Sequence, residues 1–149
     1  MLLRIALMSQ LARTHALKAS TPQALAVVRA LEEHSLAHMP QVDIETTHSL
    51  HAGCYARTIR IPANVMLTGA LMKIPTLLVF SGDADVIVGD HSERLTGYHV
   101  LEGAADRKTA FIAYADTWLT MSFATQATTV EEAEREFTDE YERLMSRKN

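Results

Sequence analysis

The sequence predicts a mainly β domain, an antiparallel sandwich or barrel with helical segments at both ends. Between residues 42 and 127, short apolar or alternating runs follow one another and are separated by tight-turn residues. No helical periodicity lies between these runs, which favours antiparallel strands over alternating strand–helix units. Residues 1–41 and 128–149 instead carry apolar residues three and four positions apart, as amphipathic helices do. We therefore expect one globular domain with three successive segments, 1–41, 42–127 and 128–149.

Length and composition support a single domain and exclude several classes of function. The chain has 149 residues, of which 48% are hydrophobic, enough for one core. Its net charge is -4, so no basic surface for nucleic acid is expected. The single cysteine, Cys54, cannot form an internal disulfide, which fits a reducing compartment. The apolar runs are shorter than a membrane span of about 20 residues. We expect a cytoplasmic protein that binds neither nucleic acid nor membrane.

The first forty residues are expected to form two helices. Residues 2–17 have apolar positions at helical spacing and predict the first one. In the second, Pro22 takes the favoured first helical position after a cap at Ser20 or Thr21. Residues 39–40, a Met-Pro pair, end that helix. Since such helices are not stable alone, the segment 1–41 must pack on the barrel or on a partner subunit.

Strands are expected from residue 42 onward. Val42 and Ile44 alternate with acidic residues, as in a half-buried strand. Thr76–Phe80 is a continuous apolar run, typical of a strand covered on both faces. Ser81–Asp83 is expected to turn the chain back, and residues 89–92 to form a second turn. The other strand-like runs are 54–61, 84–88, 97–101 and 117–123.

The C-terminal segment predicts one more helix over residues 128–149. Thr128 with Glu131, and Thr129 with Glu132, each match a capping box. Its apolar stripe consists of Ala133, Phe137, Tyr141, Leu144 and Met145. We expect this stripe to pack on the barrel, with a dimer contact as the alternative.

Several stretches, in order along residues 40–145, match the pattern of a known family. They are Tyr55–Ala63, Leu67–Gly69, Ser81–Asp83, Arg94–Gly97, Arg107–Lys108 and Asp116–Thr117. They resemble the cupin barrel, and in particular the small cupin-like proteins of bacteriophages and prophages. The resemblance implies a single antiparallel double-stranded β-helix, or jelly-roll, barrel. It also implies a homodimer, because barrels of this family usually associate.

The resemblance also shows where a metal site would lie. Metal-binding cupins carry two histidines and a glutamate in a first motif and another histidine in a second. Here Met72 and Thr76 stand where the first histidines would be, and Lys108 lies close to the position of the last. Thioether, hydroxyl and ammonium groups do not make such a site. We therefore expect no metal and no cofactor.

Charged residues of the strands suggest a site for an anion. Arg57 shares one strand face with apolar residues. If this face points inward, the guanidinium needs an acidic partner or an anionic ligand. If the face is only partly covered, Arg57 is a surface residue with a packed stem, which we favour. Arg107 and Lys108 could hold an anion at a loop, although two adjacent basic residues are usually solvated. The only tryptophan, Trp118, is expected in the core.

The candidate ligand-binding residues follow from these observations. Met72, Thr76 and Lys108 are expected to line the mouth of the barrel, with Arg57 as an anion contact. His51 precedes the Arg57 strand and is expected near the same mouth. No catalytic residue is assigned, since no nucleophile motif, phosphate loop or acid–base pair is recognisable.

These observations predict a non-enzymatic phage- or prophage-type protein that binds a small or anionic ligand, or a host or phage protein, through a metal-free barrel. One alternative is a metal-dependent cupin enzyme, of isomerase or dioxygenase type, with a site rearranged to His48, His51 and His99. The other is a structural or virion protein whose barrel is filled by side chains. For the preferred interpretation we expect a homodimer in the host cytoplasm.

Overall fold

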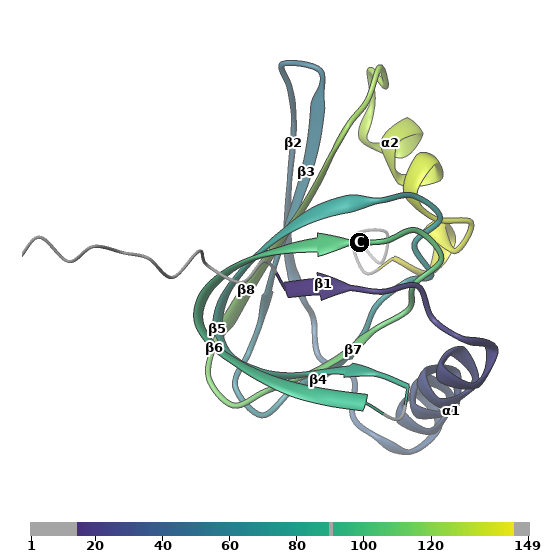
Figure 1. The fold of residues 1–149 in the computed structure, drawn as a ribbon, viewed down its shortest axis with the longest axis vertical. Helices are drawn as coiled ribbons and strands as arrows, with labels where there is room; N and C mark the ends of the chain where they lie inside the picture. Colours follow the sequence, from purple (N-terminus) through teal and green to yellow (C-terminus); the bar gives the residue numbers. More distant parts are fainter. Residues whose placement is uncertain (1–14, 90, 145–149) are drawn as a thin grey trace, which may run out of the picture.

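The computed structural model describes residues 15–89 and 91–144, and within this part of the chain eight strands form one curved sheet (Figure 1). Its centre is a hairpin of β5 (Thr76–Val88) and β6 (His91–Gly103), paired along all 13 residues of each strand. The order is β1–β6–β5–β8–β3–β2, with β7 also paired to β5 and β4 paired to β7. The other strands are β1 (His15–Leu17), β2 (Glu45–His51), β3 (Cys54–Ile61), β4 (Met66–Thr68), β7 (Ala110–Ala113) and β8 (Thr117–Ala124).

Strand β5 changes its second partner halfway along, and the sheet bends at that point. Leu77–Ser81 pair with β8, whereas Ala84–Ile87 pair with β7. The two residues between them stay paired with β6. The predicted turn at Ser81–Asp83 is therefore wrong, because this segment is a bend within one strand. Gly82 permits the bend since it has no Cβ, which would lie 2.7 Å from the Cα of Thr117.

The sheet is open, so the expectation of a closed barrel is wrong. In the described part of the chain, β1 and β2 stand at the ends of the strand order, and β4 has only β7 beside it. The β1–β6 pair is parallel, whereas the other strand pairs are antiparallel. Residues from the C-terminal segment, Ala133, Phe137 and Leu144, join the apolar core instead of a closing strand pair.

The N-terminal segment contributes one strand and one helix to the described structure. Helix α1 (Pro22–His38) begins where the sequence predicts, and Thr21 Oγ1 accepts the Ala24 amide at 3.1 Å. Val28 of this helix is fully buried, and the helix contacts β4 and β5. The helix expected over residues 2–17 is wrong for its last three residues, which form β1 on the edge of β6. Residues 2–14 lie outside the described residues.

The C-terminal segment is helical only over part of its length. Helix α2 (Val130–Phe137) starts at Thr129, whose hydroxyl accepts the Glu132 amide at 3.2 Å. It ends at Phe137, whose carbonyl accepts the Lys73 amide at 2.8 Å, and a short 3-10 helix, η1 (Tyr141–Arg143), follows. The expected helix over 128–149 is therefore interrupted within the described range. None of the described helices has the length and apolar character needed to cross a lipid bilayer.

The core lies on the inner face of the curved sheet. Along β5 and β8, buried side chains alternate with side chains on the outer face. The expectation that Thr76–Phe80 is covered on both faces is wrong, because Leu77 is 46% exposed. Trp118, expected in the core, also lies on the outer face and is 47% exposed. In both cases strand alternation decides the outcome, since neighbouring residues must point to opposite faces.

Replacing Gly82 by alanine is expected to lower the free energy of unfolding by about 2 kcal/mol, because the added methyl group overlaps Thr117. The control is Gly97→Ala on β6, directly opposite, where a methyl group meets no atom within 4 Å. The control should cost only about 1 kcal/mol, from its positive φ. Urea denaturation of both variants measures the difference, and equal losses would show that Thr117 yields to the methyl group.

Candidate functional site

The curved sheet encloses a cavity of about 160 Å³ beneath the C-terminal segment. Its apolar lining comes from β3, β5, β7, β8 and α2. These side chains are Ile59, Leu78, Phe111, Leu119, Met121 and Phe137. The charged residues that line it include Arg57, Arg107 and Glu140. An apolar cavity with a few polar groups of fixed position is the usual form of a small-molecule site.

A surface groove of about 550 Å³ adjoins this cavity. The groove and the cavity share lining residues, among them Ile44, Leu67 and Arg143. Apolar side chains with large exposed areas lie along the groove, including Leu36 (58% exposed) and Met39 (48% exposed). The groove is therefore a largely apolar surface hollow that shares part of its wall with the cavity.

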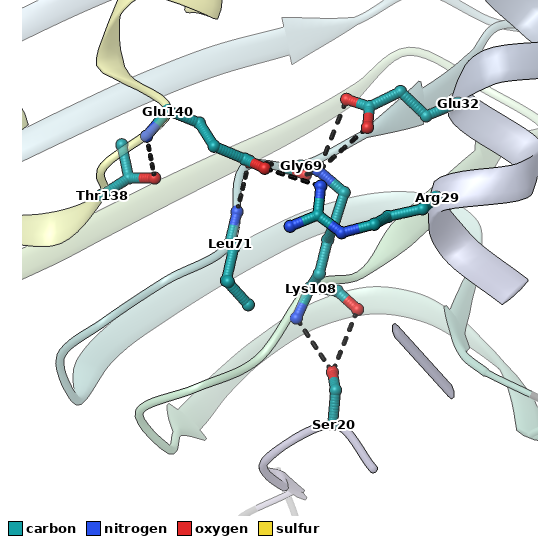
Figure 2. Close-up of polar contacts among 8 residues, drawn as sticks. All are labelled: Ser20, Arg29, Glu32, Gly69, Leu71, Lys108, Thr138 and Glu140. Carbon is teal, nitrogen blue, oxygen red and sulfur yellow. Dashed lines mark hydrogen bonds and ion pairs between the residues drawn. The ribbon is translucent and has the colours of Figure 1, made fainter. Parts of the chain in front are cut away.

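One wall of the cavity is held by the ammonium group of Lys108, which is fully buried. Figure 2 shows Lys108 between the carboxylates of Glu32 and Glu140, each 3.2 Å from Nζ, and it also donates to the Gly69 carbonyl at 2.8 Å. The Lys108 amide donates to Ser20 Oγ at 2.9 Å. Because Glu32 belongs to α1 and Glu140 follows α2, this residue connects both helical segments to the sheet.

Glu140 remains ionised at the centre of this network. Burial tends to raise its pKa, but the Leu71 amide, Lys108 and Arg29 outweigh burial and lower the pKa below its ordinary value. The Leu71 amide donates to Oε2 at 2.9 Å, and Arg29 pairs with Oε1 at 2.9 Å. The Glu140 amide donates to Thr138 Oγ1 at 3.1 Å, which also fixes the main chain (Figure 2). The cluster thus carries two positive and two negative charges and is neutral.

Arg57 also points inward, which corrects the expectation that it is a surface residue. Its side chain is 11% exposed, and its guanidinium lies 3.4 Å from Glu134, which is itself 2% exposed. Beside this pair, Tyr55 and His48 share a hydrogen bond of 2.8 Å between the phenol oxygen and Nδ1. Burial lowers the pKa of His48, and the charge of Arg57 lowers it further. The inward face of β3 therefore holds an ion pair.

Arg107 is the third basic residue at this site and has no acidic partner among residues 15–89 and 91–144. It is 2% exposed and lines the cavity, which corrects the expectation that Arg107 and Lys108 are solvated. Its guanidinium donates to the Ala104 carbonyl and to Thr76 Oγ1. Among the residues that the structure describes, no carboxylate makes an ion pair with it. Burial lowers the pKa of Arg107 to about 10, so it is still charged at neutral pH.

The structure brings together some of the predicted site residues and separates others. Arg57 and Met72 line the cavity. Thr76 is buried and holds Arg107, while Lys108 supports the wall through Glu32 and Glu140 without lining the cavity. His51 does not belong to the site, because it is exposed at the end of β2.

Sequence reasoning missed the acidic partners Glu32, Glu134 and Glu140. They lie 76, 77 and 32 positions from the basic residues that they bind. No local pattern connects residues so far apart. The sequence could show only that an inward-facing basic residue needs a carboxylate partner. It could not show which carboxylate that partner is.

The three histidines of the alternative metal site lie on different parts of the sheet. His48 and His51 belong to β2, whereas His99 belongs to β6, and β5, β8 and β3 stand between these two strands in the sheet. His99 Nε2 is hydrogen-bonded to the Thr96 carbonyl at 2.8 Å. Within residues 15–89 and 91–144, no three His, Cys, Asp or Glu side chains gather in a way that could hold a metal ion.

Comparison with known proteins gives similarity of structure only. No family model matches the chain, and no curated protein matches it. Solved structures similar to it include ectoine synthase from P. lautus (16% identity, 66% of this chain and 75% of that chain, TM-score 0.49). A second is KdgF from Halomonas sp. (12% identity, 58% of this chain and 84% of that chain, TM-score 0.48). A third is a cupin-2 domain of an XRE family transcriptional regulator from Enterobacter cloacae (8% identity, 57% of this chain and 100% of that chain, TM-score 0.46). Cupin-domain proteins are thus among its structural neighbours, and at these scores none assigns an activity or ligand to this chain.

Replacing Lys108 by methionine is expected to lower the free energy of unfolding by about 3 kcal/mol, because two carboxylates lose their buried cation. The double variant K108M/E140Q should lose less than the sum of its single variants, since it removes one of those carboxylates. Lys73→Met is the control, because Lys73 pairs with the 87% exposed Asp139 and should contribute well under about 1 kcal/mol. Urea denaturation measures all four proteins. Strict additivity of K108M and E140Q would contradict the coupling.

Proposed function

We propose that this chain is a non-enzymatic, cupin-like protein of phage or prophage type that binds a small ligand, without a metal, in the cavity of its curved sheet. The observation that carries the proposal is the apolar cavity with buried basic groups at its wall. The chain would act by holding a ligand, in the host cytoplasm, and not by chemical conversion. Binding of a host or phage protein through the adjoining groove is the corresponding macromolecular role.

The size of the cavity supports ligand binding over a barrel filled by side chains. A volume of about 160 Å³ is close to the roughly 150 Å³ of an engineered apolar cavity that binds benzene. The groove lies beside the cavity, because both are lined by Glu32, Ile44 and Thr68, so only these shared residues need to move to admit a ligand. A core packed to ordinary density would leave no such space.

Thr76 and Lys108 stand where metal-binding cupins carry histidines, and their contacts within the chain support ligand binding over a metal-dependent reaction. Thr76 accepts a hydrogen bond from Arg107, and Lys108 is neutralised by Glu32 and Glu140. In the rival enzyme, His48, His51 and His99 would have to meet around one ion. They belong to β2 and β6, which three other strands separate in the sheet order.

A thermal-shift screen tests the binding role with compounds of about the size of benzene, both neutral and anionic. We expect at least one class to raise the Tm, because a ligand that binds only the folded state stabilises it. The variant Leu119→Phe should lose this response, since the added ring takes up cavity volume. Trp118→Phe, on the opposite face of β8, should keep it. If no compound raises the Tm, the filled-barrel alternative is correct.

We further propose that the chain forms a homodimer through the outer face of the sheet. Leu77, Tyr98, Val100 and Trp118 are exposed there. Tyr98 and Trp118 both pair with Ser81, so they flank the same residue of β5. The apolar stripe of α2, in contrast, is buried in its own chain. A second copy that covers this sheet face would therefore bury the apolar surface that the chain leaves exposed.

Sedimentation velocity is expected to show a dimer for the unmodified chain. Trp118→Lys should shift it to monomer, because a charge in an apolar contact loses its hydration. Leu36→Lys is the control, since Leu36 is an exposed apolar residue of α1 outside this surface. A monomer at micromolar concentration for the unmodified chain would contradict the dimer.

A further inference from the structure

The buried charges of the described residues are balanced with one exception. Three charged residues of the described chain are almost completely buried, namely Glu134, Arg107 and Lys108. Glu134 is paired with Arg57, and Lys108 with two carboxylates. Within the described part of the chain, the Arg107 guanidinium is held by a carbonyl and a hydroxyl group, which carry no net charge. The interior of the sheet therefore contains one positive charge that its described surroundings do not neutralise.

The sequence leaves little room for an acidic partner elsewhere in the chain. Outside the described residues, Asp90 is the one Asp or Glu of the sequence.

We infer that the ligand of the cavity is a singly charged organic carboxylate with an apolar body, and that its carboxylate pairs with the guanidinium of Arg107. This inference rests on the proposed binding function and specifies the ligand. A guanidinium has five N–H donors in a planar fork that matches the two oxygens of a carboxylate. Arg107 lines the cavity, and burial already disfavours its charged form, so an anion beside it relieves that cost.

The surroundings of Arg107 favour one negative charge over two. Glu140 also lines the cavity, and the charge of its carboxylate is balanced by Lys108 and Arg29. A doubly charged phosphate monoester would exceed the single positive charge that remains. A monocarboxylate restores neutrality, as Glu134 does for Arg57.

The apolar lining determines the rest of the ligand. Leu78, Leu119, Met121 and Phe111 line the same cavity as Arg107. Arg107 does not line the groove, whereas Ile44 and Leu67 line both spaces. A ligand with its carboxylate at Arg107 therefore places its apolar body along these side chains, and a longer body extends toward the groove.

Two neighbours fix the position of the guanidinium. Thr76 Oγ1 accepts one of its N–H groups. Gly103, opposite Thr76 in β6, leaves the space for it, because a Cβ there would overlap the guanidinium carbon. Thr76 and Gly103 are positioning residues, since they act on the ligand through Arg107.

Isothermal titration with matched pairs of probes tests the inference. The pairs are benzoate with benzamide and hexanoate with hexanamide, which differ in charge and hardly in shape. We expect at least one carboxylate to bind about tenfold more tightly than its amide, a difference of about 1.4 kcal/mol. Arg107→Met should remove this preference while the amide affinity stays within about twofold.

Two further variants keep the test decisive. Arg107→Lys retains the charge without the fork and should keep part of the preference, even if Arg107→Met does not fold. Arg60→Met is the control, because Arg60 pairs with Glu45 and Asp116 and lines neither the cavity nor the groove, and it should leave the preference unchanged.

Equal binding of amides and carboxylates, or loss of the preference in Arg60→Met alone, would overturn the inference and leave the binding function standing. Failure of all four probes, at concentrations where other benzene-sized compounds raise the Tm, would overturn the inference only. Failure of every compound would overturn both.

Discussion

The buried ammonium group of Lys108 is the interaction on which the cavity depends. Removing such a cation from water is costly and is offset only by close partners with good geometry. Here two carboxylates and the Gly69 carbonyl supply them, from α1, from the chain after β4 and from the chain after α2. The same contact therefore fixes three segments that are distant in sequence. Because Glu32 and Glu140 also line the cavity, its wall is built from the partners of Lys108.

The elements of the fold that depend on neighbouring residues were predictable from the sequence. The caps at Thr21 and Thr129 are local, since each hydroxyl binds an amide three residues ahead. The bend at Ser81–Asp83 was not predictable, because glycine next to polar residues is typical of turns. Here β6 pairs across the whole bend, and Arg94 of β6 binds the Asp83 carboxylate at 2.9 Å. A long-range partner thus keeps extended a segment that favours a turn.

The site was predictable only in part, because its polar groups pair over long distances in sequence. Alternation placed Arg57 on one face of its strand, but the face that points inward is decided by the packing of the whole sheet. The adjacent residues Arg107 and Lys108 looked like one basic pair. In the structure Lys108 contacts two carboxylates, whereas Arg107 lines the cavity. The distinction that matters for function arises only once the strands are in register.

A buried ion pair and a buried charge with neutral partners have different effects on the stability of the folded chain. A neutral buried pair such as Arg57–Glu134 contributes little beyond what apolar side chains of similar size would contribute, and it needs nothing from outside. A buried guanidinium with neutral partners remains unfavourable, as the lowered pKa of Arg107 indicates. An anion that binds there therefore stabilises the folded chain by two routes, through its own contacts and by neutralising Arg107. Ligand binding and folding stability are then linked at one residue, so that the empty protein is less stable than the filled one.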